Sequence, residues 1–448
     1  MFDLTTCTLS EYADGYGKFI SDSPSSYHAA SVVAERLASA GFTRVDEREV
    51  FTGVERGFIQ RAGAVIAWQL PDEFEQSTGV RIIASHTDSP SFKIKPNADS
   101  ENAGHSQVNV EVYGGPLLNS WLNRDLGIAG QITTIDGHTH LVRTGPVMTI
   151  PQLAPHLDRS QNNNLELSRQ RDYHPIWSVS GGSIIDYVCE QAGIGPSRVA
   201  GTDLYSYDVA DYQMYGGAGG ADLFVAPRQD NLSSVYAALQ AFLSVESVDE
   251  AGAPVGLKGE PAPHDILVFA AFDHEEIGST SAYGAAGPFL ETVLRRIVAA
   301  QGIAGNAMLG ASVEEAYWRL LANSSCISAD VGHAVSPNKV EKHDPAHLVR
   351  LGNGMLVKIN AQQRYATDAQ GVQLVLRAAA HAGEAVQEIV SNNDVPAGST
   401  IGPFIASRLG ITTVDVGAPI LSMHSIREIT NPDDLLGMAR IFHSYYVD

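Results

Sequence analysis

The sequence contains little cysteine. Only three cysteines, Cys7, Cys189 and Cys326, occur in 448 residues, and they lie far apart without a CxxC pair. This pattern excludes a disulfide framework and a thiolate zinc ribbon. It fits a chain that stays in a reducing compartment.

Long apolar segments are also missing. The longest strongly apolar run, Ile266 to Phe272, is far shorter than the ~20 residues that a membrane helix needs. The first residues are acidic and lack the basic and apolar regions of a signal peptide. We therefore expect a cytoplasmic protein that does not enter a membrane.

Basic residues are scarce compared with acidic ones. Lys and Arg total 29 against 51 Asp and Glu, which gives a net charge of −22. Such a chain repels nucleic acid and anionic lipid, so we expect neither as a partner. The hydrophobic content of 44% and the length are typical of a globular protein of two or three domains.

Several catalytic motifs are absent. The sequence has no GxSxG, no HExxH and no P-loop, so a serine hydrolase with a nucleophile elbow, a zincin or a P-loop nucleotidase is disfavoured.

Residue patterns divide the chain into an α/β domain and a β-rich insertion. The insertion spans residues 93–226, where short alternating segments are separated by Gly-Gly and Asp-Gly pairs. The α/β domain comprises residues 1–92 and 227–448, where helix and strand patterns mix. Its expected helices begin near Ser26, Asn231, Pro288, Val313, Asp368 and Pro432. Its expected strands are Ala64–Leu70, Val80–Ser85, Ile266–Phe272, Cys326–Ala329, Met355–Ile359 and Ile411–Val416.

Metal-type ligands follow several of these strands. The residues concerned are His86 and Asp88, Glu275 and Glu276, Asp330, and, a few residues beyond its strand, His424. A further carboxylate, Asp230, opens an expected helix. Parallel strands of an α/β sheet place such groups at one edge. Nitrogen and carboxylate ligands suit zinc, and this many carboxylates favour two ions with a bridging carboxylate.

Acidic residues that lie close together in the sequence suggest different roles for each of them. In an extended segment, Glu275 and Glu276 point in opposite directions, so one could bind metal while the other acts as a base. His86 and Asp88 are two residues apart, which allows the carboxylate to orient the imidazole. Taken singly, each feature also has an ordinary explanation: a loop histidine, a charged surface pair, or an N-cap at Asp230.

Six segments in the same order resemble the aspartyl aminopeptidase family of dinuclear zinc exopeptidases. They are HTDSP, APRQDNLSS, FDHEEIGST, SADVGHAVSPN, QQRYATD and MHSIRE, and the similarity extends to YGGPLLNSWLNRDL in the insertion. The resemblance implies a zinc-exopeptidase-like α/β/α sandwich with a mixed central sheet, interrupted by a β-rich dimerisation domain. It also implies a large homo-oligomer, commonly a dodecamer.

The same resemblance implies two Zn²⁺ ions per subunit, with Co²⁺ or Mn²⁺ as possible substitutes. His86 and Asp330 would bind one ion, Glu276 and His424 the other, and Asp230 would bridge them. Glu275 would be the general base that activates the bridging water, and Asp88 would support His86.

Three further residues are implied to contact the substrate. His156 would reach the active site of a neighbouring subunit, Lys358 would bind an acidic side chain, and Tyr365 would donate a hydrogen bond. We therefore expect an aminopeptidase that releases an unblocked N-terminal Asp or Glu. The alternatives on the same fold are a neutral-residue aminopeptidase, a carboxypeptidase and an N-acyl amino acid deacylase. The alternative from another class is a non-catalytic assembly or binding protein, and the intact Glu275 and full ligand set disfavour it.

Overall fold

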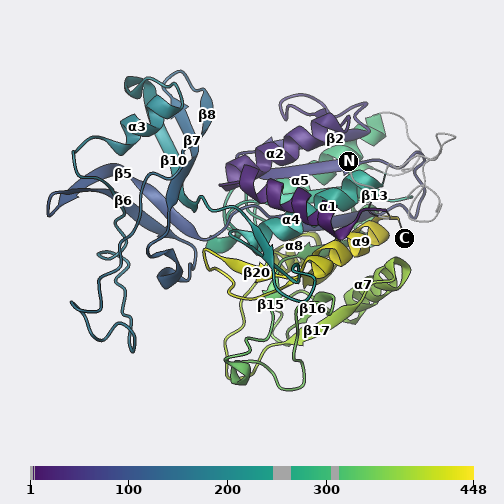
Figure 1. Ribbon diagram of the computed structural model, residues 1–448. Helices are drawn as coiled ribbons and strands as arrows, with labels where there is room; N and C mark the ends of the chain where they lie inside the picture. The colour runs from purple at the N-terminus through teal and green to yellow at the C-terminus, as the bar shows by residue number, and fades with distance from the viewer. Residues whose placement is uncertain (1–3, 5, 246–263, 304–311, 448) are drawn as a thin grey trace.

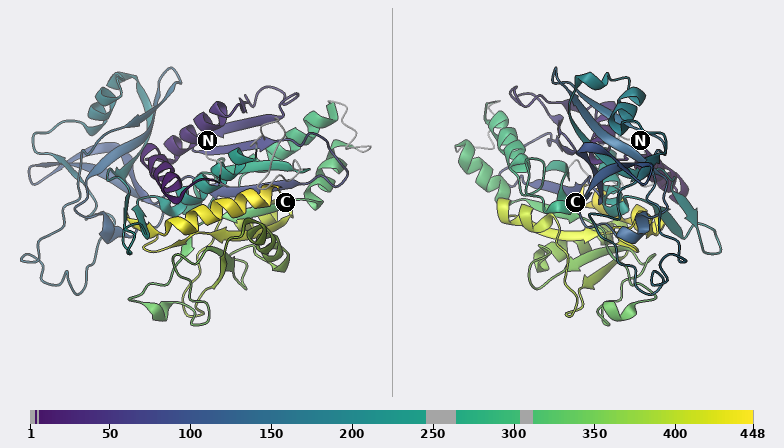
Figure 2. Two further views of the ribbon diagram at one scale, coloured as in Figure 1. Left: turned by 45° about the vertical axis from the view of Figure 1, so that its right-hand side comes forward. Right: turned by 90° about the vertical axis from the view of Figure 1, so that its left-hand side faces the viewer.

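The computed structural model describes residues 4, 6–245, 264–303 and 312–447. A nine-stranded mixed sheet with helices on both faces forms the larger part, and a second, antiparallel sheet forms a lobe beside it (Figure 1). The left-hand view of Figure 2 also shows the lobe beside the sandwich, and the right-hand view looks onto the lobe. The α/β/α sandwich with a mixed sheet that the sequence predicts is confirmed.

The central sheet places four parallel strands side by side. The strand order is β1 (Thr43–Arg44), β2 (Arg56–Arg61), β3 (Ala64–Gln69), β13 (Ile266–Phe272), β4 (Val80–His86), β14 (Ser325–Ala329), β18 (Thr412–Gly417), β16 (Met355–Ile359) and β17 (Val386–Val390). Strands β13, β4, β14 and β18 are parallel to their neighbours in this series. Their carboxyl ends therefore meet at one edge of the sheet.

Two hydrophobic cores lie on opposite faces of this sheet. Alternate residues of each strand enter different cores, as Ile82 and Ile83 of β4 do. One core contains α1 (Leu9–Asp22), α2 (Ser26–Ser39), α4 (Gln229–Ser244), α7 (Ala369–Ala382) and α9 (Pro432–Val447). The other contains α5 (Phe289–Ile303), α6 (Val313–Ala322) and α8 (Gly402–Leu409). Every residue of β13 is buried, as its continuous apolar sequence predicts.

The lobe has its own core and its own sheet. The strand order is β8 (Thr139–Arg143), β7 (Leu126–Thr134), β10 (Val199–Asp208), β5 (Ser91–Asn102), β6 (His105–Tyr113) and β9 (Ile176–Ser178). The helix α3 (Ile184–Gln191) and the 3₁₀ turns η1 (Leu118–Trp121) and η2 (Pro196–Arg198) belong to the same stretch of chain. All pairings in this sheet are antiparallel.

Short strands join the lobe segment to the end of the chain. β11 (Gln213–Tyr215) pairs with β12 (Leu223–Ala226), and β12 pairs with β20 (Glu428–Thr430). β15 (Gly332–His333) pairs with β19 (Pro419–Ile420), and two further 3₁₀ turns are η3 (Glu275–Ile277) and η4 (Val340–Lys342). This pairing brings the segment after β19 close to the start of α4.

The sequence predicts most long elements of the sandwich but misses α1, β2 and β17. The α1 helix begins with a capping box between Thr8 and Glu11, a signal that the sequence carries. β17 is short and half-buried, so its pattern is weak. In the described part of the chain, no helix is long and apolar enough to span a bilayer.

Candidate metal centre

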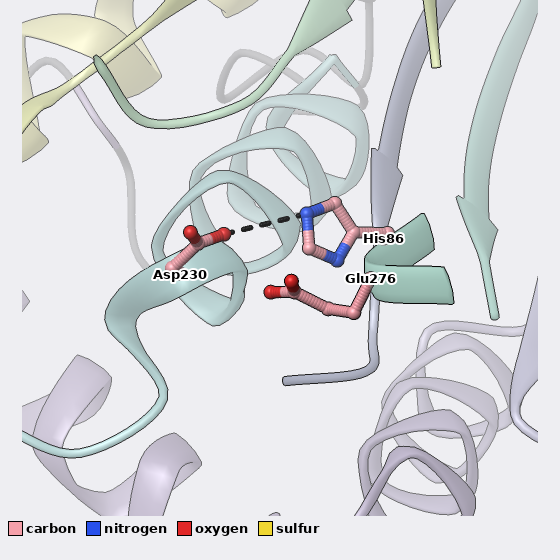
Figure 3. Close-up of side chains that lie close together, drawn as sticks. All are labelled: His86, Asp230 and Glu276. Atoms are coloured by element: carbon pink, nitrogen blue, oxygen red, sulfur yellow. Dashed lines mark ion pairs between the residues drawn. The ribbon is translucent and has the colours of Figure 1, made fainter. Parts of the chain in front are cut away.

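The predicted ligands converge at the edge where the parallel strands end. His86 is the last residue of β4, Asp330 follows β14 directly, and Glu276 lies in η3 just after β13. Figure 3 shows His86, Asp230 and Glu276 pointing toward one another. One ligand atom from each of these residues lies within 4.8 Å of the others. His86, Asp230 and Asp330 are all buried.

The carboxylate of Asp230 lies between two histidines. Its Oδ1 is 3.4 Å from His86 Nε2, and its Oδ2 is 3.3 Å from His424 Nε2. Asp330 Oδ1 is 3.5 Å from the same nitrogen of His86. Glu276 Oε2 is 3.4 Å from the same nitrogen of His424. The five side chains thus form two groups that share Asp230.

Three buried polar atoms of this cluster lack a hydrogen-bond partner among the described residues. They are His86 Nε2, Asp230 Oδ1 and Glu276 Oε1. Buried polar atoms nearly always have a partner, so atoms of this kind that face one another suit a bound cation. The donor set contains only imidazole nitrogen and carboxylate oxygen, which zinc accepts. The residues present therefore fit the zinc ions that the sequence leads us to expect.

Negative charge accumulates in this cluster. Burial raises the pKa of Glu276 well above its ordinary value, and the charge of Asp230 raises it further. Burial lowers the pKa of His86, but the nearby carboxylates of Asp230 and Asp330 outweigh that effect and raise it well above its ordinary value. A bound cation would relieve this excess of negative charge.

Each histidine is oriented by a contact of its other ring nitrogen. His86 Nδ1 is 3.0 Å from the carbonyl oxygen of Asp88 and 3.3 Å from its Oδ1. His424 Nδ1 is 2.9 Å from the carbonyl oxygen of Gly115 in the lobe. When Nδ1 donates to these oxygens, Nε2 is left free as the ligand atom in both rings.

Asp88 and Glu428 hold the surrounding backbone. Asp88 accepts hydrogen bonds from the Tyr113 hydroxyl (2.8 Å) and from the amides of Glu275 (3.0 Å) and Glu276 (3.1 Å). Glu428 accepts from the amides of Asp230 (3.0 Å) and His424 (2.8 Å). Sequence reasoning did not assign Tyr113, Gly115 or Glu428, although the first two belong to the YGGPLLNSW segment.

The expectation of an extended segment at Glu275 and Glu276 is wrong, because both residues lie in the 3₁₀ turn η3. Successive residues of such a turn are about 120° apart around its axis, so the two carboxylates still diverge. Glu275 Oε2 is 3.9 Å from His86 Nε2, whereas Glu276 lies beside His424. Burial raises the pKa of Glu275 to about 8, with His86 opposing and Asp330 reinforcing the shift.

Lys358 lies next to the ligand cluster. It is 2% exposed, and its Nζ is 3.3 Å from Asp330 Oδ2 and 5.4 Å from the ring centroid of Tyr365. Desolvation, reinforced by the charge of Lys358, lowers the pKa of nearby His333. His333 is a second basic residue of this region, and sequence reasoning gave it no role.

The predicted substrate residue His156 is not brought to the cluster within one chain. It is exposed in the stretch between β8 and β9, where Leu153 and Leu157 are 51% and 75% exposed. The prediction concerned the active site of a neighbouring subunit, so it stays a prediction.

The chain is similar to known aminopeptidases over almost its whole length. A family model described as aminopeptidase I zinc metalloprotease (M18) matches residues 19–446. A Streptomyces avermitilis protein named probable M18 family aminopeptidase 2 is 43% identical over 430 residues, covering 94% of each chain. A chain in the structure of the Ape4 and Nbr1 complex is similar with a TM-score of 0.87 and 31% identity, covering 98% of this chain and 86% of that one. A chain of the S. cerevisiae mApe1 dodecamer gives a TM-score of 0.80 and 27% identity, covering 97% and 96%.

Proposed function

Because the chain belongs to the M18 family of zinc metalloprotease aminopeptidases, we propose that it releases acidic residues from unblocked peptide N-termini. The substrate would be a peptide whose first residue is Asp or Glu with a free α-amine. The observation that carries this specificity is the buried ammonium of Lys358 beside the ligand cluster. A carboxylate on the substrate would pair with that ammonium in a charge-assisted hydrogen bond.

Five residues would hold the metal. His86 and Asp330 would bind one zinc ion, Glu276 and His424 a second, and Asp230 would lie between them. Co²⁺ or Mn²⁺ could replace zinc, since nitrogen and oxygen ligands suit these ions too. When bound, the ions would polarise the scissile carbonyl and lower the pKa of a water molecule toward ~7. The sharing of one carboxylate between two histidines supports this ligand set.

Glu275 would carry out the proton transfers. Its carboxylate lies at the edge of the ligand cluster, with Oε2 3.9 Å from His86 Nε2. It would accept the proton of the attacking water and then donate it to the amine of the leaving peptide. Asp88 would keep His86 in the tautomer that leaves Nε2 free. Tyr365, half-buried next to Lys358, would donate a hydrogen bond to the substrate.

A homo-oligomer, most simply a dodecamer, is part of the proposal. The similarity to a chain of the mApe1 dodecamer supports it. The strongly exposed Leu153 and Leu157 on either side of His156 also favour burial of this stretch against another subunit. The lobe sheet would then serve as the dimerisation domain, and His156 would reach the substrate of a neighbour. A cytoplasmic location stays a prediction from the sequence.

A substrate panel tests the function. Initial rates are measured on peptides that begin with Asp, Glu, Leu or Lys, each also in N-acetylated form, with zinc-loaded protein and a chelator-treated control. We expect chelator-sensitive cleavage of the free Asp and Glu peptides only. Equal rates on Leu peptides would keep the metal centre but refute the acidic specificity. Cleavage of acetylated substrates alone would identify a deacylase instead.

A further inference from the structure

A buried carboxylate outside the ligand cluster connects the segments around Lys358. Asp415, on β18, is fully buried. Its Oδ1 accepts hydrogen bonds from the hydroxyls of Ser328 and Thr400, both at 2.6 Å. Its Oδ2 accepts from the amide of Ala366 at 2.6 Å, and its own amide donates to the Thr367 hydroxyl at 2.9 Å. One residue thus satisfies donors from three separate segments.

Two of these three segments adjoin residues that lie next to Lys358. Ser328 lies on β14, directly opposite Asp415 and two residues before the proposed ligand Asp330. Ala366 follows Tyr365, whose ring lies next to Lys358. Thr400 belongs to the loop that leads into α8. Asp415 therefore ties a strand of the metal centre to the loop that carries Tyr365 and to the loop that precedes α8.

The start of α8 packs directly on this carboxylate. A Cβ built on Gly402 would lie 2.3 Å from Asp415 Oδ2, a distance that no side chain tolerates. The position of the loop before α8 is thus fixed by contact as well as by the hydrogen bond from Thr400. The charge of Asp415 also reaches Lys358. Burial lowers the pKa of that ammonium, but the charges of Asp330 and Tyr365, and after them that of Asp415, raise it above its ordinary value.

We propose that Asp415 is a positioning residue for acidic-substrate specificity, which it controls by fixing the Tyr365 and Thr400 loops relative to Lys358. This inference rests on the proposed function. A carboxylate suits the role because it only accepts hydrogen bonds and can accept several at once. An Asn side chain would place an NH₂ group against one of the converging donors. Loosened loops would harm an acidic substrate most, because an ion pair depends on geometry more than apolar contact does.

Two hydroxyl deletions give a matched test. Thr400→Val and Ser328→Ala each remove one 2.6 Å hydrogen bond to the same oxygen, but only the first bond holds a loop. We measure kcat/KM for Asp and Leu peptides, the zinc content, and the rate of amide hydrogen exchange at Ala366. Asp415→Asn is measured in the same way if it folds.

Thr400→Val should lower the Asp-to-Leu ratio of kcat/KM by about tenfold, as expected for a lost hydrogen bond to a charged group. It should also speed exchange at Ala366 while zinc content is unchanged. Ser328→Ala should leave both the ratio and the exchange near wild type. Equal effects of the two variants, or unchanged exchange in Thr400→Val, would overturn the proposal. If the wild-type enzyme shows no preference for acidic N-terminal residues, both the proposed function and the specificity role of Asp415 are refuted. The hydrogen-exchange rates then show separately whether Asp415 fixes the loops.

Discussion

Replacing Lys358 with Met is the sharpest test of whether this residue recognises the acidic side chain of the substrate. Methionine keeps a long unbranched side chain but removes the ammonium that lies 3.3 Å from Asp330 Oδ2. The Lys358 side chain is shielded from solvent, since it is only 2% exposed. A carboxylate that enters such a site without its cation is left desolvated and unpaired, which is costly.

The size of the effect follows from this burial. Truncating one partner of a buried hydrogen-bonded charge pair costs roughly 2–5 kcal/mol. At about 1.4 kcal/mol per factor of ten, kcat/KM for an Asp peptide should fall by roughly 30-fold to several thousand-fold. Lys358 also contacts a proposed zinc ligand, so part of this loss is shared by every substrate. Dividing kcat/KM for the Asp peptide by kcat/KM for the Leu peptide removes that shared part.

The assay compares kcat/KM for Asp and Leu peptides in wild type, Lys358→Met and the control Lys358→Arg, with zinc content measured for each. We expect the Asp-to-Leu ratio to collapse in the Met variant and to survive partly in the Arg variant, which keeps the charge. An equal fall for both substrates in Lys358→Met, with zinc retained, would show that Lys358 does not read the substrate side chain.

Three further predictions concern catalysis, metal affinity and pH. Glu275→Gln should retain zinc but lower kcat by about 10³-fold or more, the loss expected for a general base; near-normal turnover would refute that role. Tyr113→Phe removes the 2.8 Å hydrogen bond to Asp88 and should weaken zinc binding by roughly 10–100-fold in a chelator competition, whereas Tyr205→Phe, a neighbouring ring, should not. Burial, reinforced by two arginines, lowers the pKa of His28 to about 4, so its contribution to stability is complete above its unfolded pKa of about 6.5 and is lost as pH falls toward 4. His28 thus accounts for about 3 kcal/mol of the free energy of unfolding that is lost over this range. His28→Gln should therefore flatten the decline of thermal stability with falling pH, and an unchanged decline would contradict this role of His28.

Much of the centre was accessible from the sequence because its ligands follow buried strands. The apolar runs before His86, Glu276 and Asp330 predict adjacent parallel strands, and their ends bring these residues together. The bridging position of Asp230 came only from the family resemblance. Its environment depends on Glu428, almost 200 residues away, which holds its amide.

Other features could not be predicted because they depend on tertiary contacts. Nothing in the local pattern of β16 shows that Lys358 is buried, since a lone lysine on a strand is usually exposed. The hydrogen bond from His424 to Gly115 joins residues 309 positions apart. The strand pattern predicts the bounds of β13 but not the 3₁₀ turn at Glu275, because that turn is held by a distant residue, Asp88, which accepts hydrogen bonds from the amides of Glu275 and Glu276.

The number and position of bound zinc ions test the central claim most directly. Anomalous diffraction at the zinc edge from crystals of the zinc-loaded protein should show two peaks per chain, one on each side of the Asp230 carboxylate. One peak should lie beside His86 and Asp330, and the other beside Glu276 and His424. A single peak, or peaks away from Asp230, would contradict the two-ion centre on which the proposed reaction depends.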